Sequence, residues 1–186
     1  RLLTSVMVSK GWTPKSIDIR TAFLQAAPLQ REVYVRPPPE CKVPKGYCWR
    51  LKRPAYGLID ACRKWNEKVV QVMIKELKGR QSVIDKAVFY WNSGGIHGFI
   101  STHVDDFYFA GNPAFEEMIK NGIAKYMTVG TSEQGSFKYA GIQISTHPDG
   151  SVSFSLKNYI NEICQIDIPL NCETENQVNP QLQREY

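Results

Sequence analysis

The sequence lacks the long apolar segment that a membrane span requires. It contains no run of about 18 apolar residues, and its first ten residues have too short an apolar core for a convincing signal peptide. Five cysteines form no C-x-x-C pair, and the three histidines show no metal-ligand spacing. We therefore expect no membrane partner, no zinc site and no disulfide framework, in a protein that is reduced and intracellular.

The chain also lacks an initiator methionine and opens within an apparent helix, which suggests a segment of a polyprotein or a longer gene. Its 186 residues provide one ordinary domain or a large part of a bigger one. The charge is divided unevenly: residues 1–80 carry 17 Lys and Arg against 6 Asp and Glu, whereas residues 81–186 carry 6 against 12. This asymmetry fits a protein that grips a polyanion with one region and holds metal with the other, although a bipolar solvated surface would have the same composition.

The hydrophobic pattern predicts a mixture of helices and strands. Helices are expected over residues 1–10, 58–77, 114–126 and 157–164, with a short helical turn at 21–25. Strands are expected over residues 13–19, 32–36, 87–91, 137–145 and 151–155, and a β-hairpin over 99–111. This order predicts an α+β fold, a βαββαβ-like antiparallel sheet with helices on one face.

Two adjacent carboxylates, Asp105 and Asp106, fall at the expected tip of the 99–111 hairpin. Neighbouring anions repel each other, so the pair lowers stability unless a cation such as Mg²⁺ bridges it. A surface turn with two solvated acids is the alternative. In the predicted sheet the strand that carries Asp18 can lie beside the hairpin, and three acids on adjacent strands behind a basic region suit two-metal phosphoryl transfer.

Five segments in this order resemble the reverse transcriptase domain of copia-type LTR retrotransposons. They are Ser16–Gln25, similar to D-V-K-T-A-F-L; Glu32–Pro38, similar to E-V-Y-M-x-Q-P-P; Leu51–Asn66, similar to L-K-K-S-L-Y-G-L-K-Q-A-P-R-x-W; His103–Asp106, similar to Y-V-D-D; and Phe137–Ile144, similar to Y-F-L-G-I-E-I. The variant residues, His103 among them, are most similar to GalEa-like copia elements of marine animals.

The resemblance implies an RNA-directed DNA polymerase, a nucleotidyltransferase that adds deoxynucleotides to a primer 3′-hydroxyl. Asp18, Asp105 and Asp106 would be the catalytic, metal-binding triad, with the Ile19 carbonyl contributing. Two Mg²⁺ ions would be the cofactors, and Mn²⁺ could substitute.

The same resemblance places a nucleotide site at Phe23, Tyr56 and Gly57. The Phe23 ring would exclude a 2′-hydroxyl, unless it is an ordinary core aromatic. Gly57 would let the backbone approach the templating pair or the incoming base, and it also fits a helix-entry turn. Primer and template contacts are implied for His103, Val104, Lys52, Arg53, Arg63, Lys64 and Gly141.

Two of these contacts have structural alternatives. Arg63 and Lys64 are equally compatible with a solvated helix face. Trp65 falls on the apolar stripe of the expected helix, which favours a core position over a base-stacking platform.

The chain departs from the family pattern at three positions. His103 replaces Tyr, Asp60 replaces Gln and Cys62 replaces Pro. A smaller, ionisable ring at 103 puts the primer contact in doubt, and the other two changes put template handling in doubt.

As domains, the resemblance implies a polymerase palm with partial fingers over residues 1–165, a fingers-like insert at about 30–56, and a polar tail or connection towards a thumb at 166–186. The partners would be an RNA or DNA template with a DNA primer and deoxynucleoside triphosphates. Integrase, for DNA integration, would precede the segment and RNase H would follow it in the polyprotein, within cytoplasmic virus-like particles. The segment alone can lack activity.

Other functions compatible with the sequence are a catalytically silent relic or a domesticated nucleic-acid-binding module. A palm-like enzyme of different chemistry, such as a nucleotide cyclase, is a third possibility. The second and fifth motifs argue against the cyclase, and the intact triad argues against a relic.

Overall fold

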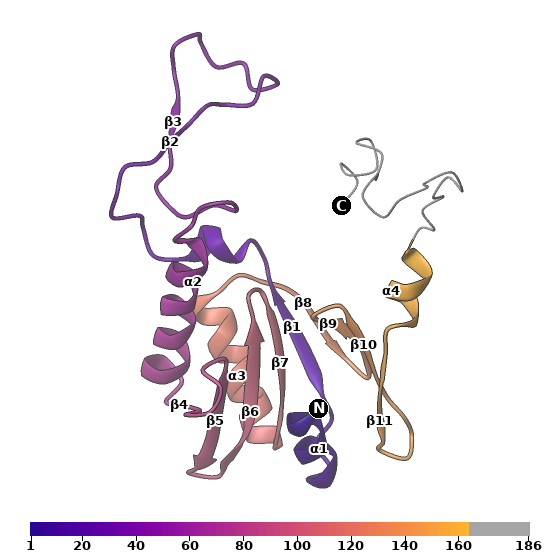
Figure 1. The fold of residues 1–186 in the computed structure, drawn as a ribbon. Coiled ribbons are helices and arrows are strands. Elements are labelled where there is room, and N and C mark those ends of the chain that lie inside the picture. Colours follow the sequence, from indigo (N-terminus) through magenta and orange to yellow (C-terminus); the bar gives the residue numbers. More distant parts are fainter. Residues whose placement is uncertain (164–186) are drawn as a thin grey trace, which may run out of the picture. The chain divides into compact units, whose positions relative to one another are not determined.

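A computed structural model of the protein describes residues 1–163 (Figure 1). Residues 1–156 form one compact unit, and a second unit begins at residue 157 with the helix α4 (Lys157–Glu162). The tail expected at 166–186 lies outside the described residues, as do Cys164 and Cys172. Among residues 1–163, no helix is long and apolar enough to cross a membrane.

Six strands form the main antiparallel sheet of the first unit (Figure 1). In spatial order they are β4 (Arg80–Gln81), β5 (Val88–Ser93), β6 (Ile96–His103), β7 (Asp106–Gly111), β1 (Lys15–Ile19) and β8 (Val129–Gln134). Along the chain, β1 is followed by a helix, β6 and β7 by a second helix, and that helix by β8. The combination of helices with antiparallel strands confirms the α+β class.

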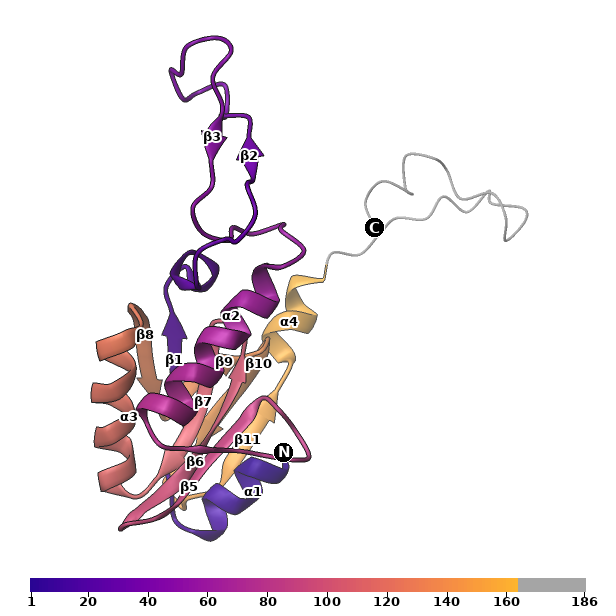
Figure 2. The same ribbon diagram turned by 90° about the vertical axis from the view of Figure 1, so that its left-hand side faces the viewer.

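Helices cover one face of this sheet (Figure 2). They are α2 (Ala61–Val70), its continuation as a π-helical segment η2 (Gln71–Glu76), and α3 (Pro113–Tyr126). Because side chains alternate along a strand, Phe107 and Phe109 of β7 point to this face and are fully buried against the helices. Helix α3 begins where the Asn112 side chain accepts a hydrogen bond from the Phe115 amide at 3.0 Å.

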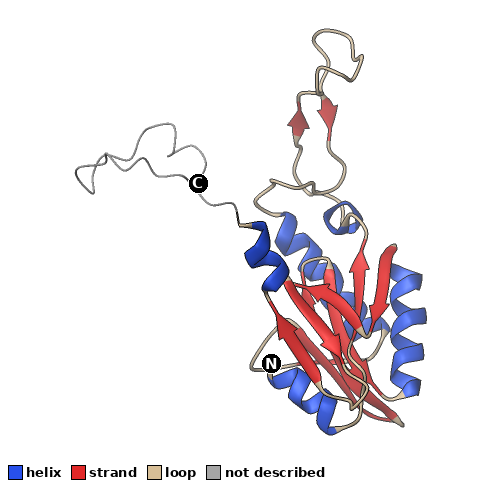
Figure 3. Ribbon diagram, turned by 90° about the vertical axis from the view of Figure 1, so that its right-hand side faces the viewer, coloured by secondary structure: helices blue, strands red, loops and turns tan. Residues whose placement is uncertain are grey.

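The opposite face of the main sheet is covered by α1 (Leu2–Ser9) and by a second sheet (Figure 3). Its strands, in spatial order, are β11 (Val152–Ser155), β10 (Ile142–Thr146) and β9 (Ser136–Tyr139). The side chains of β7 that alternate with Phe107 and Phe109 pack here, where Tyr108 lies in a core cluster with Met7 and Phe137. The main sheet therefore lies between two apolar cores.

Residues 30–56, expected as an insert, project from the first unit as a long hairpin (Figure 1). It follows a 3₁₀ helix η1 (Ala22–Gln25) and contains the short strands β2 (Tyr34–Val35) and β3 (Trp49–Arg50). Its base is closed by backbone hydrogen bonds from Leu29 to the Lys52 carbonyl at 3.0 Å and from Leu51 to the Val33 carbonyl at 2.8 Å. Three prolines after β2 have no N–H to continue the ladder, which is why the paired segment is so short.

The structure corrects two predicted strands. Residues 137–145 do not form one strand, because Ala140 and Gly141 both have positive φ (47° and 81°) and form the two-residue turn between β9 and β10. These strands also do not complete the main sheet: its last strand is β8, which the sequence did not predict. In addition, the helix expected from Leu58 begins at Ala61.

Candidate active site

The hairpin of β6 and β7 carries Asp105 and Asp106 at its tip, as predicted. His103 pairs with Asp106, so Val104 and Asp105 are the two loop residues. Val104 has a φ of +52°, a left-handed conformation that is a genuine outlier for a β-branched residue. Such strain is found where the surrounding structure holds a functional residue in place.

Asp18 lies directly opposite Asp106 in the β1–β7 ladder. The next amide along β1, that of Ile19, donates a hydrogen bond to the Asp105 carbonyl at 2.8 Å. The sheet thus brings together acids that are far apart in the sequence, as expected for the strand of Asp18 and the 99–111 hairpin. Like charges directly opposite each other on neighbouring strands are destabilising on their own.

Burial and the repulsion between these acids both act on the pKa values of Asp18 and Asp106. Burial raises the pKa of Asp18, and the charges of Asp105 and Asp106 raise it further, while Arg20 opposes them. Burial also raises the pKa of Asp106. That increase is opposed by a hydrogen bond from the Ala140 amide and by His103, and Asp105 adds to it. A bound cation would relieve the excess of negative charge at this point.

The oxygen atoms available at this site are of the type that binds a magnesium ion. Carboxylate and carbonyl oxygens are the ligands that Mg²⁺ prefers. Among residues 1–163, no group of three or more His, Cys, Asp or Glu side chains is arranged so that it could hold a metal ion by itself. Magnesium is usually held by one or two carboxylates together with waters and substrate phosphates, so a site of this kind does not need three protein side chains as ligands.

The residues predicted to bind nucleotide lie next to these acids. The ring of Phe23, in η1, is 4.7 Å from the ring of Tyr56 in an edge-on contact. Burial raises the pKa of Tyr56, and the charges of Asp105 and Asp18 raise it further, which brings the ring pair within electrostatic range of the carboxylates. Phe23 is buried and Tyr56 is 60% exposed, so the pair presents a ring to solvent beside the acids.

Gly57 adopts a φ of +90° in the turn that leads into α2. A Cβ at this position would meet nothing within 4 Å. The backbone conformation, rather than a lack of space, therefore requires glycine here. This supports the helix-entry turn and leaves the space in front of the backbone open.

The turn between β9 and β10 contains Gly141, the residue predicted to contact the primer. Its neighbour Ala140 donates the amide hydrogen bond to Asp106. The Tyr139 hydroxyl donates to Ser101 Oγ at 3.3 Å, which joins β9 to β6. This turn therefore lies against the acidic hairpin.

The four predicted phosphate-binding cations have different surroundings. Lys64 is buried, and its Nζ lies 2.9 Å from Glu67 Oε2, while the exposed Arg63 pairs with the other carboxylate oxygen, Oε1, at 3.5 Å. Arg53 donates to the Ala26 carbonyl at 2.7 Å. Lys52 is exposed. Arg63 thus lies on an exposed face of α2, as both of its alternatives require, and Lys64 is held within the fold.

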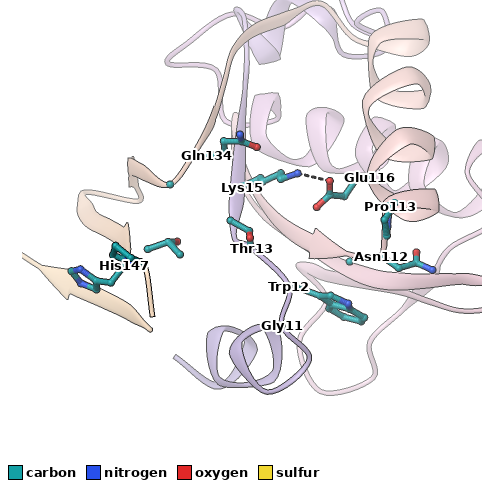
Figure 4. Close-up of a pocket in the computed structure, with 13 residues that line it drawn as sticks. Gly11, Trp12, Thr13, Lys15, Asn112, Pro113, Glu116, Gln134 and His147 are labelled. Carbon is teal, nitrogen blue, oxygen red and sulfur yellow. Dashed lines mark hydrogen bonds and ion pairs between the residues drawn. The ribbon is translucent and has the colours of Figure 1, made fainter. Parts of the chain in front are cut away.

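A cavity of about 710 Å³ lies at the other end of β1, away from the acids (Figure 4). Lys15 and Glu116 form an ion pair in its wall. Because these two charges neutralise each other and none of the three aspartates lines it, this cavity is not part of the acidic site.

Comparison with known proteins identifies the family. The model of the family described as reverse transcriptase (RNA-dependent DNA polymerase) matches residues 1–178. The chain belongs to this family.

Relatives of this reverse transcriptase domain are transposon proteins. It is 26% identical over 86% of its length to the retrovirus-related Pol polyprotein from transposon RE1 of Arabidopsis thaliana, of which the match covers 11%. It is 30% identical over 60% of its length to the corresponding RE2 polyprotein, of which 8% is covered. A putative transposon Ty5-1 protein of Saccharomyces cerevisiae is 25% identical over 77% of the chain, which spans 47% of that protein. The resemblance to copia-type elements is thereby confirmed, and the GalEa-like placement stays a prediction.

The structure of the reverse transcriptase domain adds one residue that the sequence reasoning missed. Gly130, in β8, lies beside Asp18: a Cβ at this position would be 2.3 Å from Asp18 Oδ2. An isolated glycine within a strand often marks a place where another group approaches the backbone closely. Gly130 could have been recognised in this way, but its polar stretch was not predicted to be a strand.

Proposed function

We propose that this chain is the palm, with part of the fingers, of an RNA-directed DNA polymerase that transfers deoxynucleotides onto a primer 3′-hydroxyl. The observation that carries the proposal is the placement of three acids on adjacent strands at the hairpin tip: Asp18 lies opposite Asp106, and the Asp105 carbonyl accepts the Ile19 amide hydrogen bond. The pKa values of Asp18 and Asp106 are both raised, which supports a site whose negative charge a divalent cation would neutralise.

In this proposal Asp18 and Asp105 would hold two Mg²⁺ ions, for which Mn²⁺ could substitute, and the Ile19 carbonyl would be a further ligand. When bound, the ions would favour the ionised primer hydroxyl and neutralise the charge that develops on the leaving pyrophosphate. Asp106 adds negative charge and is kept in place by the Ala140 amide. The chain's own contribution is positioning and charge, which is what phosphoryl transfer mainly requires.

The ring pair of Phe23 and Tyr56 would lie under the sugar of the incoming deoxynucleotide. Phe23 is buried against Tyr56, and in this proposal its ring would leave no room for a 2′-hydroxyl. The open space in front of Gly57 leaves room for a base. Lys52 and the β9–β10 turn at Gly141 would contact an RNA or DNA template and its DNA primer, with His103 and Val104 at the primer end.

The setting is proposed from the relatives, whose names describe Pol polyproteins of transposons. In a polyprotein of this kind the domain would function together with an integrase and an RNase H, inside cytoplasmic virus-like particles. A thumb would be required for primer extension, so the isolated segment can be inactive.

Primer extension by a longer segment of the element, including the regions that flank this chain, tests the proposal. Asp105→Asn removes a carboxylate charge while keeping the side-chain shape, and it is expected to abolish Mg²⁺-dependent extension. Asp149→Asn is the control, because this exposed turn residue lies in the β10–β11 connection and its amide oxygen can still accept the Ser151 hydrogen bonds. Undiminished synthesis by the Asp105 variant would refute the assignment.

The alternative function, a silent nucleic-acid-binding module, makes a different prediction for the same protein. It should bind a primer–template duplex without any Mg²⁺-dependent binding of deoxynucleotide. Measuring both affinities, with and without Mg²⁺, separates the two functions even if extension is too slow to detect.

A further inference from the structure

Trp65 makes a contact that its place in the apolar stripe of α2 does not require. The side chain is 3% exposed, and its Nε1 donates a hydrogen bond to the Val104 carbonyl at 2.6 Å. Val104 is the loop residue with the left-handed φ of +52°. The indole therefore holds the strained residue that immediately precedes Asp105.

The two peptide planes that flank Asp105 are both fixed from outside the hairpin. The Val104 carbonyl belongs to the peptide before Asp105 and is held by Trp65. The Asp105 carbonyl belongs to the peptide after it and is held by the Ile19 amide at 2.8 Å. With both planes fixed, the Cα–Cβ direction of Asp105 is fixed as well. One of these two tethers is a side chain, so it can be removed by substitution.

There is free space beside the hairpin loop into which it can move if the hydrogen bond from the indole is lost. A cavity of about 410 Å³ borders both Trp65 and Val104 on the α2 side of the hairpin. A left-handed conformation is unfavourable for valine, and free space beside it lets the turn relax. Relaxation would rotate the peptide before Asp105 and turn its carboxylate.

We propose that Trp65 is a positioning residue, whose indole N–H holds the Val104–Asp105 peptide in its strained orientation and so aims the Asp105 carboxylate. The inference rests on the proposed function in that Asp105 is taken to bind metal. It assigns Trp65 a role beyond core packing and different from a base-stacking platform, since the ring is buried.

The test compares two buried tryptophans whose indole N–H groups donate to different backbone carbonyls. Trp65→Phe keeps an aromatic ring but removes the donor to Val104. Trp91→Phe is the matched control, because Trp91 is 7% exposed and its Nε1 donates to the Leu77 carbonyl at 2.7 Å, within the same core. Both variants lose one indole hydrogen bond to a backbone carbonyl, and only the first affects the hairpin tip.

Binding of Mn²⁺ alone to the full chain, followed by electron paramagnetic resonance, measures the site without requiring activity. Trp65→Phe is expected to weaken Mn²⁺ binding by about tenfold, as loss of a group that orients a metal ligand does. Trp91→Phe is expected to leave it unchanged, at a similar melting temperature. Equal Mn²⁺ affinities for the two variants would overturn the inference.

Two further variants separate the possible failures. If Asp105→Asn weakens Mn²⁺ binding and Trp65→Phe does not, the role of Trp65 is wrong and the metal site stands. If neither weakens it, the proposed metal site itself is wrong. In Val104→Gly, positive φ carries no side-chain penalty, so Trp65→Phe should reduce Mn²⁺ affinity less than it does in the natural sequence. An equal reduction in both backgrounds would contradict the role of strain.

Discussion

At the residue scale, Gly130 leaves the space that the Asp18 carboxylate occupies. Its φ is not positive, so alanine is tolerated by the backbone and the consequence is purely one of contact. A methyl group 2.3 Å from Oδ2 must displace the carboxylate, because the other neighbour within reach is the backbone of Asp18 itself. The position of the Asp18 carboxylate therefore depends on residue 130 having no side chain.

We expect Gly130→Ala to lower the rate of primer extension by about a hundredfold, since a displacement of about 1 Å in a catalytic group has effects of this size. Single-turnover kinetics at saturating deoxynucleotide measure it. Gly122→Ala, in α3, is the matched control: there a Cβ would meet Leu77 Cδ2 at 2.3 Å, the end of a flexible side chain remote from the acids. A Gly130 variant as fast as the Gly122 variant would show that Asp18 tolerates the methyl group.

At the element scale, one ion pair joins the projecting hairpin to the start of α2. Arg31 Nε and Nη2 lie 3.0 and 2.9 Å from the two carboxylate oxygens of Asp60, in a bidentate arrangement. Asp60 stands where the motif quoted above has Gln, and its negative charge is what makes the contact with Arg31 an ion pair. The hydrogen bond from Arg31 lowers the pKa of Asp60.

Arg31→Gln is expected to increase the rate of proteolytic cleavage in residues 36–48 several-fold, because it frees the base of the hairpin. Arg50→Gln is the control and should have a smaller effect, since Arg50 pairs with Glu32 through one contact at 3.0 Å and both side chains are about 60% exposed. The stabilisation that the ion pair gives to the base of the hairpin depends on pH. It is fully present above the ordinary Asp60 pKa of 3.8, and it is lost as the pH falls through the lowered pKa that Asp60 has in the folded protein.

Local patterns predicted the elements whose apolar residues alternate or recur strongly. The β6–β7 hairpin with Asp105 at its tip and the helix α3 follow from the residues themselves. Strand β8 did not, because its exposed residues are polar and its assignment depends on pairing with β1, a partner distant in sequence. The positions of Ala140 and Gly141 were likewise missed as a turn, since alanine carries no signal for positive φ.

The site could be predicted only in part, for the same reason. Spacing alone cannot show that Asp18 meets Asp106. The predicted strand order allowed the Asp18 strand to lie beside the hairpin, and the family resemblance grouped the three acids as a triad. Neither residue-level reasoning nor resemblance revealed the Trp65 hydrogen bond or the role of Gly130. Both are contacts between elements, which depend on how α2 and β8 pack against the hairpin.

At the scale of the whole molecule, the division of charge agrees with two separate tasks. The basic residues 1–80 include the projecting hairpin and α2, whereas the acidic triad draws two of its three members from the acidic part of the chain. The structure refines this division, because several cations of the basic part are engaged within the protein. A count of charges therefore overestimates the number available to a phosphate backbone.

Lys52 and Lys64 allow that distinction to be measured. The affinity for a primer–template duplex should fall linearly with the logarithm of salt concentration, with a slope set by the number of phosphates neutralised. Lys52→Gln is expected to reduce that slope by about one, because Lys52 is exposed on the same segment as the base of the hairpin. Lys64→Gln should leave the slope unchanged, since its Nζ is buried against Glu67, although it can lower the melting temperature. Fluorescence anisotropy between 50 and 200 mM salt gives both slopes. If Lys64→Gln reduced the slope more than Lys52→Gln, the α2 face that carries Lys64 would have to contact the nucleic acid.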